Sequence, residues 1–188
     1  MNKPKSIILC VGHYQKRQGT KNPGTGISEW QINRIFTERL ARQLVFCNYK
    51  VTVIDNDALT RKVKAINSIM PDIAIDIHCN AFDGNIKGHE CLYWHLSGKG
   101  KLLANLICDS ISFNHNRMSK PVITEAGSYF CRTTRPVSIV LETSFIDNDN
   151  DFYPFIWSMF DTAKEVKAGI KFYFRYLEGI PGSINLNS

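Results

Sequence analysis

Hydrophobic and polar positions change their periodicity from one segment of the chain to the next. Segments with a continuous or alternating apolar pattern predict β-strands, at residues 6–11, 50–54, 73–78, 89–95 and 137–142. Segments whose apolar residues recur every three or four positions predict helices, at residues 28–44, 60–69, 97–111 and 156–177. Residues 114–131 are polar and fit a loop with a short strand. Strands that alternate with helices predict a three-layer α/β/α fold with a mainly parallel, mixed sheet of about six strands.

Two of the predicted helices have strong individual signals. Ser28 and Gln31 form a capping box at the start of the first helix. Its apolar stripe consists of Ile32, Ile35, Phe36, Leu40 and Leu44. The last helix has the longest stripe, consisting of Ile156, Phe160, Ala163, Val166, Ile170, Phe174 and Leu177. By contrast, residues 89–95 alternate in polarity, which is typical of an edge or half-exposed strand.

The length and hydrophobicity of the chain suit a single domain. Its 188 residues are 44% hydrophobic, and we expect residues 1–188 to form one domain with a core at about 6–177 and a loose tail at 179–188. No apolar run approaches the roughly 20 residues that span a bilayer, so stable membrane insertion is not expected. The apolar run at 6–11 is too short for a signal peptide, which predicts synthesis in the cytoplasm.

The six cysteines fit a reducing compartment. They lie at positions 10, 47, 79, 91, 108 and 131, without a CxxC pair and mostly in apolar contexts. We interpret them as buried free thiols rather than as disulfides or a metal site.

The positive charge is concentrated in the N-terminal third of the chain. Residues 1–64 contain 12 Lys and Arg against 4 Asp and Glu, whereas the whole chain has a net charge of +6. This distribution favours an anionic polymer as partner, such as nucleic acid, membrane headgroups or bacterial wall. An ordinary solvated face explains it equally well.

Ionisable residues follow three of the buried strands at their carboxyl ends. These residues are His13, His78 and Glu142. Ligands of open α/β sheets bind at the carboxyl ends of the strands, so these side chains could converge there. Glu29, directly after the helix cap, belongs to the same rim. Two imidazoles and a carboxylate are a known ligand set for catalytic zinc, which keeps an open position for water.

Each of these residues also has a structural interpretation. His13 could be an ordinary loop residue, and Glu29 could simply complement the helix dipole. Glu142 could form a salt bridge with Arg132 or Arg135. Their common position at one edge of the sheet is what favours a functional site.

The remaining histidines are weaker candidates. His89 and His95 flank a strand and are expected near the surface, and His115 lies in a polar loop. Cys79 adjoins His78, but neighbouring strand residues point to opposite faces, so the two are not expected to bind one metal ion.

Four segments carry a family resemblance. Residues 7–44 contain a strand that runs into Gly-His, a glycine-rich loop and a Glu that begins a long helix. DIAIDIHCNAF (72–82) is similar to a strand that ends in Ser-x-His-x-Asn, and GHECLYW (88–94) to a Gly-x-Glu-x-Tyr strand. RPVSIVLETSFIDN (135–148) is similar to Pro-x-x-Leu-x-Glu-x-Gly-Phe-x-x-Asn. In this order, over about residues 6–177, they resemble the zinc-dependent N-acetylmuramoyl-L-alanine amidases.

This resemblance implies a reaction and the residues that perform it. It implies one zinc ion held by His13, Glu29 and His78, with Glu142 as the catalytic acid/base. The implied reaction is hydrolysis of the amide bond between N-acetylmuramic acid and L-alanine in bacterial peptidoglycan.

The chain departs from the family pattern at two positions. Asp76 replaces the usual Ser, and Ser144 replaces the usual Gly. Neither is one of the implied site residues, so the departures bear on fine geometry and substrate preference rather than on the chemistry.

The resemblance also implies a biological setting. A single catalytic domain without a visible leader is typical of a lysin-like, monomeric enzyme that reaches the bacterial wall or periplasm after release. Its expected partner is peptidoglycan rather than nucleic acid, and the basic N-terminal part could supply attraction to the wall.

Two alternatives remain open from the sequence. One is a zinc exopeptidase or another amidohydrolase on the same scaffold. The other is a metal-free wall-binding protein without catalytic activity.

Overall fold

The computed structural model describes residues 3–111, 118–122 and 128–180. Six strands form one sheet in the order β2-β1-β3-β6-β4-β5. Their bounds are β1 Ser6–Val11, β2 Lys50–Ile54, β3 Ile73–Asn80, β4 Glu90–Trp94, β5 Met118–Val122 and β6 Val137–Phe145. The pairs β1–β2, β1–β3, β3–β6 and β4–β5 are parallel, whereas β4–β6 is antiparallel. The predicted mainly parallel, mixed sheet is therefore confirmed.

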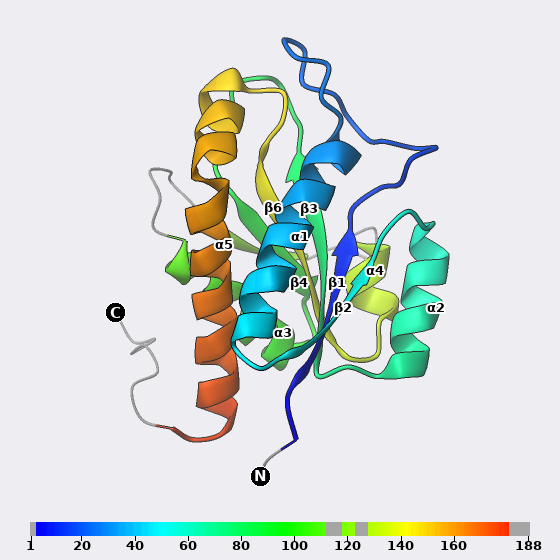
Figure 1. Cartoon of the computed structure of the whole chain (residues 1–188), viewed down its shortest axis with the longest axis vertical. Coiled ribbons are helices and arrows are strands. Elements are labelled where there is room, and N and C mark those ends of the chain that lie inside the picture. The colour runs from blue at the N-terminus through cyan, green and yellow to red at the C-terminus, as the bar shows by residue number, and fades with distance from the viewer. Residues whose placement is uncertain (1–2, 112–117, 123–127, 181–188) are drawn as a thin grey trace.

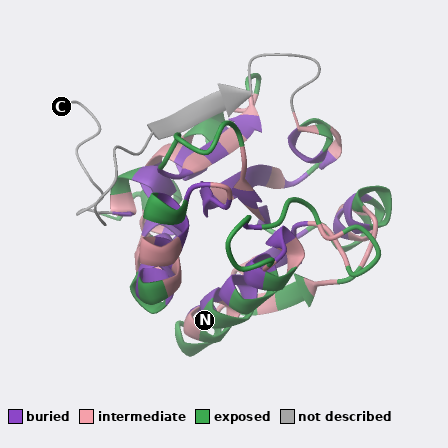
Figure 2. Ribbon diagram, turned by 90° about the horizontal axis from the view of Figure 1, so that it is seen from above, coloured by how far each residue is buried: buried purple, intermediate pink, exposed green. Residues whose placement is uncertain are grey.

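Helices cover both faces of this sheet (Figure 1). Their bounds are α1 Glu29–Phe46, α2 Leu59–Ile69, α3 Gly98–Ser110, α4 Tyr129–Thr133 and α5 Asp149–Leu177. α1, α3 and α5 pack on one face around the larger hydrophobic cluster, and α2 and α4 pack on the other face around the smaller one. The purple, buried positions of Figure 2 lie between these layers. The three-layer α/β/α architecture is thus confirmed.

The continuous apolar run of β1 reflects burial on both faces of the strand. Ile7 and Leu9 belong to the cluster under α1 and α5, and Ile8 and Cys10 belong to the cluster under α2 and α4. None of these side chains is more than 1% exposed. Full burial of an aliphatic side chain contributes about 1.5–3 kcal/mol, so alternation with polar residues would destabilise this strand.

α1 begins where its capping box predicts. The Ser28 side chain accepts a hydrogen bond from the Gln31 backbone, and the Gln31 side chain accepts one from the Ser28 backbone. This cap fixes Glu29 as the first residue of the helix. The predicted stripe is buried except for Ile35, which is 46% exposed, because the sheet and α5 cover a narrower face than the pattern predicts.

The stripe of α5 is also narrower than predicted. Phe160 and Leu177 are 51% and 44% exposed, so these two stripe residues lie outside the buried face of the helix. The Phe160 ring lies 4.3 Å from the Lys164 ammonium at the surface, and Leu177 is the last residue of the helix. Close packing occurs at Gly169 instead, where an added Cβ would lie 2.6 Å from the Cα of Ile107 in α3.

The region between α3 and β6 contains more regular structure than predicted. β5 supplies the expected short strand, whereas α4 is a helix that the sequence patterns do not predict. Because β5 pairs with β4, the half-exposed β4 is an interior strand and not an edge.

The positions of the histidines and cysteines follow the predictions only in part. His89 is 1% exposed, so its predicted surface position is wrong, whereas His95 is exposed as predicted. All six cysteines are free, and all except Cys47 are buried.

His115 and the predicted loose tail beyond residue 180 lie outside the described residues. None of the described helices has the length and apolarity needed to cross a bilayer.

Candidate metal centre

The site lies where three neighbouring parallel strands end. β1, β3 and β6 are adjacent in the sheet and run in the same direction. β1 leads into Gly12 and His13, and His78 and Glu142 are register partners on β3 and β6. The N-terminus of α1 brings Glu29 to the same edge. This is the convergence that the strand ends predicted.

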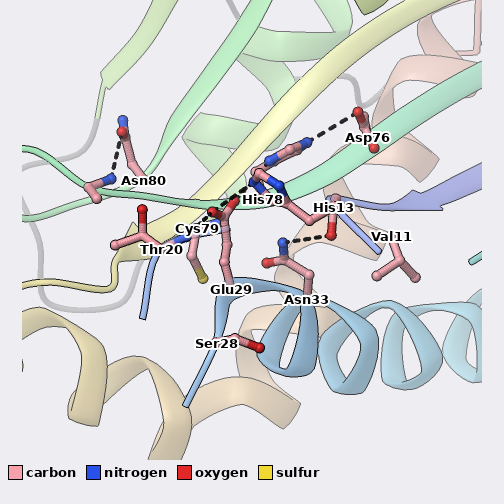
Figure 3. A network of polar contacts seen from close by, with 12 residues as sticks. Val11, His13, Thr20, Ser28, Glu29, Asn33, Asp76, His78, Cys79 and Asn80 are labelled. Carbon is pink, nitrogen blue, oxygen red and sulfur yellow. Dashed lines mark hydrogen bonds and ion pairs between the residues drawn. The ribbon is translucent and has the colours of Figure 1, made fainter. Parts of the chain in front are cut away.

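Glu29 lies between the two histidines. Its Oε2 is 2.9 Å from His13 Nε2, and its Oε1 is 2.9 Å from His78 Nδ1. One donor atom from each of the three residues can be chosen so that all lie within 4.8 Å of one another. Figure 3 shows the three side chains pointing toward one another from the β1 end, α1 and β3. Two imidazole nitrogens and one carboxylate oxygen at this spacing suit a single divalent ion.

Two glycines let the chain approach this cluster closely. An added Cβ at Gly12 would lie 2.4 Å from the Ile77 carbonyl oxygen, and one at Gly19 would lie 2.4 Å from Glu29 Oε2. Gly19 also has a φ of +73°, which non-glycine residues rarely adopt. His13 itself has a φ of 64° and holds this conformation without a glycine's freedom. The loop after β1 is therefore shaped around the cluster.

The histidines keep Glu29 ionised. Burial alone would raise the pKa of this carboxyl, but its hydrogen bonds with His13 and His78 outweigh burial and lower the pKa to about 2. Backbone N–H groups of Thr20 and Cys79 also donate to it, at 3.4 and 3.3 Å. Glu29 is 5% exposed, so it provides a buried negative charge at neutral pH.

The surroundings of Glu142, unlike those of Glu29, favour the neutral form of its carboxyl group. Burial, together with the charges of Glu29, Asp76 and Glu90, raises its pKa to about 7, although His78 acts in the other direction. Within the described part of the chain its buried Oε2 has no hydrogen-bond partner. A carboxyl with a pKa near neutrality can accept a proton and return it at physiological pH.

The structural alternative for Glu142 does not occur among the described residues. Within them, no ion pair joins Glu142 to Arg132 or Arg135. The two arginines lie just before β6, whereas Glu142 is near the opposite end of that strand. The alternative interpretation, a salt bridge with one of these arginines, therefore finds no support in this part of the chain.

Two charged residues that the sequence patterns do not assign to the site lie behind His78. Asp76 Oδ2 lies 3.2 Å from His78 Nε2, and the Lys62 ammonium lies 4.0 Å from Asp76 Oδ1. In the sequence, Asp76 stands out only as a departure from the family pattern. Lys62 had a signal of its own, because it shares the buried face of α2 with Val63 and Ile66. A lysine on the apolar face of an amphipathic helix indicates a buried partner.

Cys79 makes its side-chain contacts away from the cluster of His13, Glu29 and His78. Cys79 Sγ lies 3.1 Å from Thr143 Oγ1 and belongs to the core cluster rather than to the donor set, as strand alternation predicted. The fold and the donor set together define an α/β protein with a candidate mononuclear metal centre at the carboxyl edge of its sheet.

Comparison of the sequence with models of known protein families identifies the family of this chain. The chain belongs to the N-acetylmuramoyl-L-alanine amidase family, which matches residues 7–171. The protein is therefore an enzyme that hydrolyses the amide bond between N-acetylmuramic acid and L-alanine in peptidoglycan, as the resemblance implied. No curated protein matches the chain significantly.

Several solved structures share the fold. The CwlD amidase from Clostridioides difficile, in complex with the GerS lipoprotein, is 21% identical with a TM-score of 0.83, over 92% of this chain and 99% of that one. The catalytic domain of the CD27L endolysin targeting Clostridia difficile is 26% identical with a TM-score of 0.79, over 89% and 97%. The amidase AmiC2 of Nostoc punctiforme is 21% identical with a TM-score of 0.77, over 93% and 97%.

Proposed function

We propose that His13, Glu29 and His78 bind one zinc ion and that Glu142 is the catalytic acid/base of the amidase reaction. The observation that carries this proposal is the convergence of three donor atoms within 4.8 Å beside a carboxyl whose pKa is raised to about 7. The donor set is typical of catalytic zinc, which has three protein ligands and one open position. When bound, zinc would supply a Lewis acid that polarises the scissile carbonyl and acidifies the attacking water.

The protein groups have separate tasks in this mechanism. Glu29 is ionised and buried, so it would offset part of the positive charge of the metal without first losing a proton. His13 and His78 would bind the metal as neutral imidazoles, through the ring nitrogens that face Glu29 in this structure. Glu142 takes a proton from the attacking water at its carboxylate and donates it to the leaving amine of L-alanine.

We propose further that residues 1–188 act as one catalytic domain on the bacterial wall. Family membership disfavours the alternative of a zinc exopeptidase, and the compact donor set disfavours a metal-free binding protein. The GerS complex belongs to CwlD, and a monomer remains our prediction for this chain.

Digestion of purified peptidoglycan tests the reaction and its metal dependence together. We expect fragments with new L-alanine amino termini and no new reducing sugars, and we expect a strong chelator to stop their release until zinc is added back. Fragment mass analysis makes both measurements. New reducing ends would indicate a glycosidase, and full activity in the chelator would contradict the zinc proposal.

Attraction to the wall has a candidate surface on the structure. A groove of about 400 Å³ lies between the end of α1 and the middle of α5. Half of its lining residues are basic and half are neutral; they are Arg39, Arg42, Lys164 and Lys167, and Gln43, Phe46, Cys47 and Phe160. Among its described lining residues there is no carboxylate, although Lys164 pairs with the adjacent Asp161 at 2.9 Å. We propose that this groove, rather than the whole N-terminal part of the chain, attracts anionic polymers of the wall.

Charge reversal tests this surface separately from catalysis. The R39E/R42E variant should bind wall preparations about tenfold more weakly at low salt, and salt should weaken the wild type more than the variant because it screens these contacts. Sedimentation of the enzyme with purified walls measures both. Equal binding and equal salt response of the two proteins would show that the groove does not bind the wall. As a control, the variant should turn over a soluble muropeptide at the wild-type rate.

A further inference from the structure

A buried pair of opposite charges lies directly behind the metal-ligand candidate His78. Asp76 on β3 and Lys62 on α2 are each 2% exposed. The Asp76 carboxylate lies 3.2 Å from His78 Nε2 through Oδ2, and its Oδ1 is 4.0 Å from the Lys62 ammonium. Figure 3 shows Asp76 on the side of His78 that faces away from Glu29. The pair therefore contacts the site from outside the set of metal ligands.

Lys62 also reaches the segment that carries the other histidine. Its ammonium donates to the carbonyl oxygens of Val11 and His13, the latter at 3.2 Å. His13 has a left-handed backbone with a φ of 64°, a conformation that persists only where surrounding contacts hold it. One buried ammonium thus joins the backbone of His13 to the carboxylate that contacts His78.

We propose that Asp76 and Lys62 are positioning residues that prepare both histidines for the metal. This inference rests on the proposed zinc site. A neutral imidazole has one N–H donor and one acceptor nitrogen. Asp76 holds the proton on Nε2 of His78, which leaves the lone pair of Nδ1 on the side of Glu29 and His13. Carboxylate partners of this kind fix the orientation of metal-binding histidines and increase their basicity.

Lys62 makes this arrangement possible in the interior. A buried carboxylate without a compensating charge would be strongly destabilising. The ammonium supplies that charge and at the same time fixes the carbonyl group of His13, so the geometry of the two histidines is coupled through one side chain. A lysine that only stabilised the fold would have no need to contact the segments of both histidines.

Zinc affinity tests the proposal without relying on turnover. We expect Asp76→Ala to weaken zinc binding by about 10- to 100-fold, as loss of an outer-shell partner typically does. Asp76→Asn keeps an oxygen acceptor for Nε2–H and should lose less. Lys62→Met should also weaken binding, because it releases both the Asp76 carboxylate and the His13 carbonyl. Competition with a chromophoric chelator gives the affinity, and the visible absorption of the Co²⁺-substituted proteins reports ligand geometry.

A buried carboxylate near the same edge of the sheet provides the control. Asp151 is fully buried and accepts hydrogen bonds from the backbone N–H groups of Phe145 and Gly88, at 2.7 and 3.1 Å. Asp151→Asn should lower the free energy of unfolding while leaving zinc affinity and the Co²⁺ spectrum unchanged. Unfolding of every variant is measured on the metal-free protein.

The outcomes separate this inference from the function on which it rests. Wild-type zinc affinity and an unchanged Co²⁺ spectrum in Asp76→Ala would show that the pair is only structural and would overturn the inference. If Asp76→Ala does not fold, the same result with the near-isosteric Asp76→Asn and with Lys62→Met would overturn it equally. Failure of the wild type to bind zinc would instead overturn the proposed metal centre, and the inference with it.

Discussion

Glu142→Gln is expected to reduce turnover of peptidoglycan by about 10²- to 10⁴-fold, the range that one general acid/base contributes. Gln has nearly the same shape, but it cannot accept the proton of the attacking water or return it to the leaving amine. The three proposed ligands are untouched, so the variant should retain wild-type zinc content. Turnover of peptidoglycan and metal content per chain are the measurements. A variant with near-normal turnover would show that another group moves the proton.

Stability of the metal-free protein gives an independent check on the same residue. The pKa of Glu142 is raised from its ordinary value of 4.5 to about 7, because burial and three nearby acids oppose its charge. The folded state therefore binds this proton more tightly than the unfolded state, and the contribution of Glu142 to wild-type stability falls as pH rises from 4.5 to 7. We expect Glu142→Gln to be more stable than the wild type at pH 8, and we expect this difference to vanish near pH 4. A gain in stability of Glu142→Gln that does not depend on pH would show that the raised pKa of Glu142 is not its cause.

Much of the site could be predicted because it depends on local sequence and on one topological rule. The strands before His13, His78 and Glu142 are recognisable as largely apolar runs, although Asp76 interrupts the second and Ser138 the third. The carboxyl ends of adjacent parallel strands share an edge. Glu29 could be placed as well, since the Ser28 capping box fixes the first residue of α1 to within one position. These signals need no knowledge of distant contacts.

The contact between Lys62 and Asp76 behind His78 could not be predicted in the same way. Lys62 and Asp76 belong to different elements, and their contact depends on how α2 packs on the sheet. Their burial is a property of the assembled fold, which neither local pattern contains. The buried position of His89 and the exposed position of Phe160 have the same origin, because both depend on which neighbouring segment covers the residue.

Glu29→Gln should have the largest effect on the metal. Gln keeps the shape and one oxygen acceptor but lacks the charge that offsets a divalent ion. Since loss of an outer-shell partner already costs about 10- to 100-fold in affinity, loss of a charged ligand should cost at least about 100-fold. Activity should fall with zinc occupancy and recover partly in excess zinc. Chelator competition and turnover across a zinc titration are the measurements, and unchanged affinity would remove Glu29 from the ligand set.

Glu38→Gln is the matched control on the same helix. Glu38 is exposed and pairs with Arg34 at 3.4 Å, so its loss should change stability by less than about 0.5 kcal/mol and leave zinc affinity unchanged.

Glu29 and Glu142 should also affect the stability of the metal-free protein at neutral pH in opposite directions. The pKa of Glu29 is about 2 in the folded protein against an ordinary 4.5, because the two histidines favour its charged form despite burial. Its stabilisation is therefore fully present above pH 4.5 and is lost as pH falls toward 2. Metal-free Glu29→Gln should be less stable than the wild type at pH 7, whereas Glu142→Gln should be more stable than the wild type at this pH. The same sign for both variants would contradict the assignment of one carboxylate as a permanent charge and the other as a proton carrier.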